Sequence, residues 1–350
     1  MSGALHFVWA ATLGTGGQTR VIAIAHDDTP LVSAYAWNNG FGTKFANPST
    51  LPVGFSGSDV AFSPAGDAMV MALMSNNYPS QPDASAYAWN NGFGVKLASP
   101  EPTSPAQLSE SRGTGVAFAP SGNAVAVTNS GTGLLNVYAW SNGFGAKYPG
   151  PDSSLTGSGL GVSFSPSGNA VAVAHANSPV VSVYHWSDGF GAKHADPSVP
   201  PPPFYGYDLA FTPSGDALAV VHFDSPYLSI YPWANGFGSR YASPTLPAVN
   251  FAFRVAFSPA GDAVAVAYNG SPCLAVYPWA NGFGAKFADP ASPPTGLGRG
   301  IAFSPAGDAV AVAHANYPYI SVYPWSNGFG TKFADPATPL PNAGNRITFL

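Results

Sequence analysis

Residues 301–336 read IAFSPAGDAVAVAHANYPYISVYPWSNGFGTKFADP, and this stretch decides the fold. The apolar residues alternate with a period of two, as in β-strands, over four short segments: 301–303, 309–314, 319–325 and 331–334. The first two segments are joined by Ser304-Pro305-Ala306-Gly307-Asp308 and the last two by Asn327-Gly328. Proline presets φ for a turn, and Asn-Gly tolerates the positive φ of a type I′ turn. We therefore expect four antiparallel strands joined by hairpins.

This unit recurs seven times along the chain. Its tryptophan stands at the end of the third strand in every copy: Trp37, Trp89, Trp140, Trp186, Trp233, Trp279 and Trp325. Repeats of this length stack on their neighbours because one unit cannot bury its own faces. Seven four-stranded units with no helical pattern predict an all-β fold, a seven-bladed β-propeller that forms one domain over residues 1–350.

Three copies carry a proline inside the third strand, at Pro232, Pro278 and Pro324. Proline has no N–H to donate to a ladder. We expect the sheet to break locally at these positions.

Two segments could close the ring. Residues 346–349 repeat the phase of the first strand, and the first copy lacks its own Ser-Pro-Xaa-Gly turn. The C-terminal segment would then supply the inner strand of the first blade. The alternative is that residues 5–9 take this place.

The composition limits the partners of the protein. Only 8% of the 350 residues are charged, with 12 basic against 17 acidic side chains, and no basic stripe suits nucleic acid. No apolar run approaches the length of a membrane span, and residues 1–14 lack the charged start of a signal peptide. The single Cys273 excludes an intrachain disulfide and a cysteine-rich metal site. We expect no metal and no cofactor.

Val116-Ala117-Phe118, a Pro-Ser-Gly turn, an alanine-rich strand and Val-Tyr-Ala-Trp140 together resemble WD40 repeats, and the resemblance extends over residues 20–349. It implies a propeller that serves as a rigid docking platform. No tryptophan is followed by Asp, and no Gly-His precedes the first strand, so the polar network of that family is not carried over. The Asn-Gly-Phe-Gly-x-Lys phrase is similar to near-identical propeller repeats in predicted proteins of phages and uncultured bacteria.

The end of the second strand and the loop after it supply the candidate ligand site. These positions share one face of a propeller and carry imidazole and phenol groups, which combine a flat apolar surface with a polar tip: His26, His175, His222, His314, Tyr268, Tyr227, Tyr317 and Tyr319. The alternative is that each histidine hydrogen-bonds the loop of its own blade.

Charged residues recur at two further positions of the unit. Asp59, Asp208, Arg254 and Arg346 share one phase of the first strand, near the central channel, where they are expected to pair. Six lysines and Arg240 lie on the fourth strand, where charge discourages edge-to-edge aggregation.

Catalytic motifs are missing from the sequence: there is no HExxH, GxSxG or P-loop, and the two glutamates, Glu101 and Glu110, lie in one insertion. We therefore expect no enzyme but a binding or structural propeller in a virion (phage tail-associated) or on a cell surface. Its partner would be a host receptor, a glycan or a neighbouring subunit of a larger assembly. The alternatives are a cytoplasmic docking scaffold and a free lectin.

Overall fold

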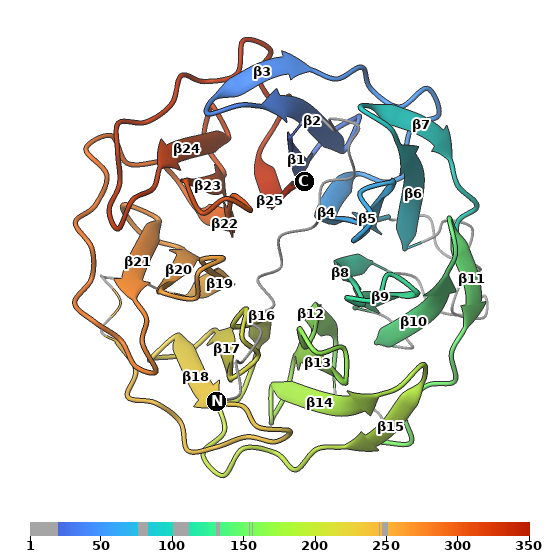
Figure 1. The fold of residues 1–350 in the computed structure, drawn as a ribbon, viewed down its shortest axis with the longest axis vertical. Coiled ribbons are helices and arrows are strands. Elements are labelled where there is room, and N and C mark those ends of the chain that lie inside the picture. The colour runs from blue at the N-terminus through green and yellow to red at the C-terminus, as the bar shows by residue number, and fades with distance from the viewer. Residues whose placement is uncertain are drawn as a thin grey trace, which may run out of the picture.

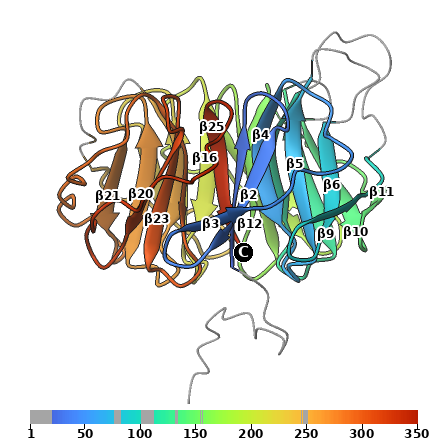
Figure 2. The same ribbon diagram turned by 90° about the horizontal axis from the view of Figure 1, so that it is seen from above.

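The computed structural model describes residues 20–75, 83–100, 112–130, 134–153, 155, 157–244, 246 and 251–350. In these ranges the chain forms 25 β-strands and no helix, arranged as seven antiparallel sheets around an axis (Figure 1). Seen from the side, the molecule is a disc with the inner strands running along its axis (Figure 2). The predicted WD40-like seven-bladed propeller is confirmed. Glu101, Glu110 and the segment 5–9 lie outside the described residues.

Blades 1 to 4 each have four strands. Blade 1 comprises β25 (Gly344–Phe349), β1 (Val21–His26), β2 (Val32–Trp37) and β3 (Phe41–Lys44). From the inner strand outward, blade 2 comprises β4 (Ser56–Phe62), β5 (Ala68–Met74), β6 (Ala84–Trp89) and β7 (Phe93–Lys96). Blade 3 comprises β8 (Gly113–Phe118), β9 (Ala124–Asn129), β10 (Leu135–Trp140) and β11 (Phe144–Lys147). Blade 4 comprises β12 (Gly159–Phe164), β13 (Ala170–His175), β14 (Val181–Trp186) and β15 (Phe190–Lys193).

Blades 5 to 7 have three strands each. Blade 5 comprises β16 (Gly206–Phe211), β17 (Ala217–His222) and β18 (Leu228–Pro232). Blade 6 comprises β19 (Ala252–Phe257), β20 (Ala263–Tyr268) and β21 (Leu274–Pro278). Blade 7 comprises β22 (Gly298–Phe303), β23 (Ala309–His314) and β24 (Ile320–Pro324). The third strand ends at the proline, and the outer segment pairs through one bridge, such as Trp233 to Phe237. The expected break is confirmed.

The hairpin after the tryptophan differs from the two-residue turn that was expected. Trp37 pairs with Phe41, so the loop holds three residues, Asn38, Asn39 and Gly40. Asn39 has φ 49° and Gly40 has φ 145°, both positive as their residue types allow. The phenylalanine that follows packs edge-on against the tryptophan, with ring centroids 5.5 Å apart for Trp37 and Phe41.

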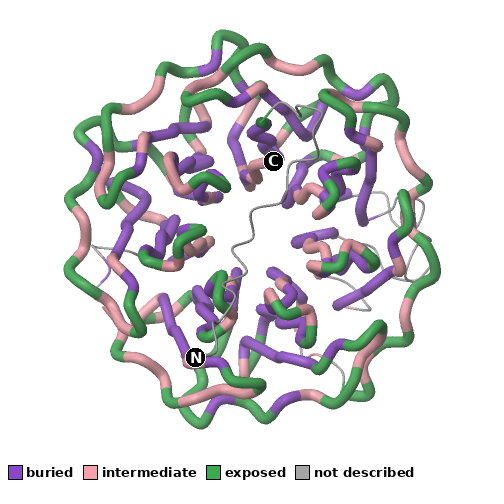
Figure 3. The backbone as a smooth tube through the Cα atoms, viewed as in Figure 1, coloured by how far each residue is buried: buried purple, intermediate pink, exposed green. Residues whose placement is uncertain are grey.

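The core lies between the blades. The second strand of every blade is buried on both faces (Figure 3). In blades 3, 4, 6 and 7 it alternates valine with alanine, and the small alanine side chains allow close stacking of the sheets. Within the described ranges no helix is long and apolar enough to cross a membrane.

The C-terminal strand closes the ring. β25 pairs antiparallel with β1, with Ile347 opposite Ile24 and Phe349 opposite Ile22. The first and last of the described strands, β1 and β25, therefore belong to one sheet, and β1 has a partner strand on both edges.

Candidate functional site

The inner strands show where the seven blades differ. The last residue of the inner strand, which in blades 2 to 7 precedes the turn that leads to the second strand, is a phenylalanine in all seven blades: Phe62, Phe118, Phe164, Phe211, Phe257, Phe303 and Phe349. At the opposite end, four residues earlier, the equivalent positions carry Ser58, Thr114, Leu160, Tyr207, Phe253, Arg299 and Asn345. Since the fold is the same in every blade, the variation marks the end of the channel that serves something other than folding. We call this end the mouth.

A layer of ion pairs crosses the channel beneath the mouth. The guanidinium of Arg346 lies 3.1 Å from the carboxylate of Asp59 in the neighbouring blade and 2.8 Å from that of Asp208 in blade 5. Arg346 therefore reaches from blade 1 to a blade that is not its neighbour (Figure 1). The expected pairing is confirmed for Arg346, Asp59 and Asp208.

Arg254 completes this layer. Its Nη1 donates to the backbone carbonyl oxygen of Phe253 at 2.9 Å. Burial lowers the pKa of Arg254, and the adjacent charge of Arg346 lowers it further. Burial also raises the pKa of Asp59, and the attraction of Arg346 offsets this only in part. The layer holds two carboxylates and two guanidinium groups, so its formal charges cancel.

Glycine leaves the room that the charged side chains need. The three remaining positions of the layer are Gly115, Gly161 and Gly300. A Cβ at Gly161 would lie 2.9 Å from the Cα of Asp208, and one at Gly300 would lie 3.0 Å from the Cα of Arg346. On the far side of the layer from the mouth, Asp59 and Arg346 also line a cavity of about 410 Å³ among the inner strands.

A carboxylate held by three blades lies at the mouth. Asp27, just after β1, accepts hydrogen bonds from the Ser56 hydroxyl at 2.6 Å and from the Asn345 amide at 2.9 Å. The Arg299 guanidinium donates to its second oxygen at 3.1 Å and to the Asn345 side-chain oxygen at 3.0 Å. The side chains of Arg299 and Asp27 remain 32% and 33% exposed, so both groups face solvent.

These contacts fix the charge of the cluster. Partial burial raises the pKa of Asp27, but the hydrogen bonds from Ser56 and Asn345 and the charge of Arg299 together bring the pKa below its ordinary value. Asp27 is therefore ionised at neutral pH beside a guanidinium with solvent-facing atoms. We call Asp27, Ser56, Arg299 and Asn345 the mouth cluster.

An aromatic wall continues the mouth on the next blades. Tyr207 and Phe253 occupy the same strand position as Arg299 and Asn345, on β16 and β19, and their ring centroids are 5.5 Å apart. Four consecutive blades, 5, 6, 7 and 1, thus carry Tyr207, Phe253, Arg299 and Asn345 at one level. Aromatic faces can hold the apolar face of a ring, and the guanidinium and amide can bind its oxygens.

The four histidines predicted as ligands lie in the interior. His26, His175, His222 and His314 are fully buried, each beside the serine seven residues later. In His222, Nδ1 donates to the carbonyl oxygen of Asp224 at 2.9 Å, which leaves Nε2 to accept from Ser229 at 3.0 Å. The H-x₆-S spacing is the sequence signal of this arrangement. Their rings are not presented to a ligand on the surface.

The predicted tyrosines are divided between interior and surface. Tyr268 is fully buried and donates to the carbonyl oxygen of Leu274. Tyr227 and Tyr319 are half-buried, and Tyr317 is 66% exposed beside Tyr319. The structure brings Tyr317 and Tyr319 together on one loop and does not join them to the mouth cluster. A ligand site at these tyrosines stays a prediction.

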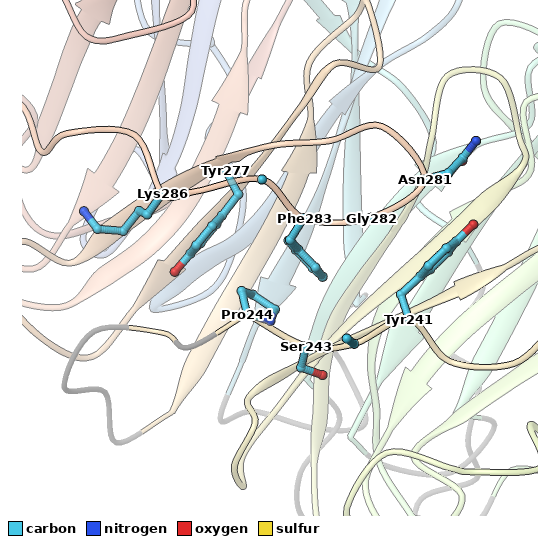
Figure 4. A pocket seen from close by; sticks show the side chains of 10 residues that line it. Tyr241, Ser243, Pro244, Tyr277, Asn281, Gly282, Phe283 and Lys286 are labelled. Atoms are coloured by element: carbon cyan, nitrogen blue, oxygen red, sulfur yellow. The ribbon is translucent and has the colours of Figure 1, made fainter.

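A second hollow lies at the outer edge, between the outer segments of blades 5 and 6 (Figure 4). Tyr241, Pro244, Tyr277, Phe283 and Lys286 line this open pocket of about 610 Å³. The tyrosine equivalent to Tyr277 donates to a linker carbonyl in other blades, as Tyr35 does to Thr338. The pocket therefore belongs to the packing of the linker and carries no distinct chemistry. Among the described residues, no group of His, Cys, Asp or Glu could hold a metal ion.

The fold is shared with many solved structures. No protein-family model matches the sequence, and no curated protein matches it either. A candidate 6-phosphogluconolactonase from Bacteroides uniformis matches with TM-score 0.72 and 16% identity, over 95% of this chain and 100% of that one. The periplasmic gluconolactonase PpgL of Pseudomonas aeruginosa matches with TM-score 0.69 and 15% identity, over 95% and 99%. The Cps50 (Swd1) propeller domain of Myceliophteria thermophila matches with TM-score 0.57 and 14% identity, over 81% and 87%.

These comparisons correct the functional prediction. A non-enzymatic propeller of a virion or cell surface was expected, but three of the propellers that match over nearly the whole chain are named as a gluconolactonase or as 6-phosphogluconolactonases. The absence of linear catalytic motifs was the basis of that prediction. The prediction missed the mouth, whose residues come from separate blades and form no linear motif. At sequence identities of 14–16%, the similarity to these structures shows a shared fold and nothing more.

Proposed function

We propose that this protein is a hydrolase that opens a sugar lactone at the mouth of its central channel. The observation that carries the proposal is the row of Tyr207, Phe253, Arg299 and Asn345 on four consecutive blades, with the Asp27 carboxylate behind Arg299 and Asn345. The names of the similar propellers support the same chemistry. The row combines an apolar face with an ionised acid and a cation, which are the groups that lactone opening needs.

The chemistry follows from these groups. The lactone ring would rest on Tyr207 and Phe253 with its carbonyl oxygen toward Arg299. Water attacks the carbonyl carbon, the Asp27 carboxylate accepts the proton of that water, and the guanidinium stabilises the oxyanion. The bond from the carbonyl carbon to the ring oxygen then breaks, and the proton passes to that oxygen. The product is the open-chain hydroxy acid.

The test measures acid release from glucono-1,5-lactone in a pH-stat, relative to spontaneous hydrolysis. We expect the protein to accelerate the reaction. Arg299→Gln should lower kcat/KM by about 100-fold, because removing one donor to an oxyanion costs that much in other hydrolases. Asp27→Asn should cost a similar factor, as expected for a lost general base.

The matched control is Lys96→Gln on the outer strand β7, which should retain wild-type activity. Circular dichroism of every variant checks that the propeller is folded. Hydrolysis no faster than in buffer, or a folded Arg299→Gln protein as active as wild type, would refute the proposal.

A further inference from the structure

A continuous aromatic surface leads away from the mouth over blades 5 and 6. Starting at Phe253, ring centroids are 4.8 Å from Phe253 to Phe251 and 5.5 Å from Phe251 to Phe223. Tyr205, directly before β16, stacks on Tyr207 within β16, with ring centroids 6.0 Å apart. We call these five residues the aromatic track.

The track is exposed although nothing in the repeat requires it. Tyr205 is 45% and Phe223 is 38% exposed. The positions equivalent to Tyr205 and Phe251 carry small, charged or aliphatic residues in the other blades: Ser56, Arg112, Ser158, Leu297 and Ala343. Contiguous exposed apolar side chains usually mark a binding surface, since their exposure to water is unfavourable. This patch begins at the mouth and ends away from the axis.

The geometry of the rings suits flat, ring-shaped units. The ring planes of Tyr205 and Tyr207 are inclined by 16° to each other, and those of Phe223 and Phe251 by 12°. Two stacked rings form one aromatic block, and its uncovered surface can pack against the apolar C–H face of a pyranose ring while the sugar hydroxyls remain in water.

The charges near the mouth select an uncharged ligand. Arg299 is paired with Asp27, and Arg346 is paired with Asp59 and Asp208. Arg254 lies in the same layer as Arg346, so these three guanidinium groups are matched by the three carboxylates of Asp27, Asp59 and Asp208. A phosphate group would therefore compete with Asp27 for Arg299, and with Asp59 and Asp208 for Arg346.

From these observations we propose that the substrate is the lactone of an uncharged oligosaccharide. The lactone unit occupies the mouth, and the sugar units that follow it rest on Phe251, Phe223 and Tyr205. This inference rests on the proposed lactonase function and names its substrate class.

The test compares kcat/KM for three lactones: glucono-1,5-lactone, 6-phosphoglucono-1,5-lactone and cellobiono-1,5-lactone. We expect the disaccharide lactone to exceed the monosaccharide lactone by about tenfold, a factor set by one stacked sugar ring. The phosphorylated lactone should be the poorest of the three. In Phe223→Ala and Tyr205→Ala the advantage of the disaccharide should shrink toward one, whereas Val95→Ala on the exposed outer strand should preserve it.

Calorimetric titration with cellotetraose, which has no lactone, separates the two proposals. Binding that is weakened in Phe223→Ala, without hydrolysis of any lactone, would support the track and refute the lactonase. The protein could instead hydrolyse all three lactones without preferring the disaccharide and fail to bind cellotetraose. That result would refute the role of the aromatic track and would still support the lactonase function. A preference for the phosphorylated lactone would overturn the charge argument.

Discussion

The buried histidines show what one side chain contributes to this fold. Each imidazole forms a hydrogen bond with a serine on the next strand, and the neutral ring of His222 satisfies both of its contacts, with Nδ1 as donor and Nε2 as acceptor. Burial lowers the pKa of His222 and His314 to about 4. The alternation in the second strand predicts that these residues end a strand at one face. It cannot show that the ring turns inward, because this depends on the partner serine across the hairpin.

This arrangement predicts a loss of stability in mild acid. The histidine pKa is 6.5 in the unfolded chain and about 4 in the folded chain for His222 and His314, so the unfolded chain binds more protons between these values. The stabilisation is complete above pH 6.5 and is lost as the pH falls toward 4, on the order of 3 kcal/mol for each residue. Thermal unfolding followed by fluorescence at pH 7, 6 and 5 should show a falling Tm.

His314→Gln keeps an amide near Ser321 and removes the titrating group. Its Tm should depend less steeply on pH than that of the wild type. Equal steepness in the two proteins would show that other groups cause the acid sensitivity.

At the scale of the strand, proline decides how wide a blade is. In blade 6 the ladder between β20 and β21 runs to the pair of Ala263 and Pro278, and the Pro278 carbonyl still accepts from Gly284 at 3.0 Å. What is lost is the N–H that would face the outer segment. Blades 1 to 3 have alanine at this position, Ala36, Ala88 and Ala139, and keep a fourth strand.

Pro278→Ala should therefore restore an outer strand in blade 6. The new N–H supplies a hydrogen bond, and hydrogen–deuterium exchange should slow over residues 283–287. Global stability should change by less than about 1 kcal/mol, because the added hydrogen bond and the lost rigidity of proline oppose each other. Ala88→Pro is the reverse control and should speed exchange over β7. Unchanged exchange in both variants would contradict this explanation.

At the scale of the whole molecule, the tryptophan period and the turn chemistry predict the seven blades and the all-β class, whereas the sequence left two candidates for the closing strand, of which the structure shows residues 344–349. These features repeat locally, so a single sequence reveals them. The mouth was not predictable as a site, because Asp27, Ser56, Arg299 and Asn345 are far apart in the chain and meet only when β25 joins β1. The shared phase of Asp59, Asp208, Arg254 and Arg346 was visible in the sequence, but their pairing across the channel depends on closure.

The claim that depends on this whole arrangement is that the mouth binds a sugar lactone. The most direct measurement is a crystal structure with glucono-1,5-lactam, an amide analogue that resists opening. We predict its ring against Tyr207 and Phe253, with the carbonyl oxygen within hydrogen-bond distance of the Arg299 guanidinium. An analogue bound beside Tyr317, or in the outer pocket near Tyr277, would contradict the proposed site. The absence of the analogue from the mouth at a saturating concentration would contradict it as well.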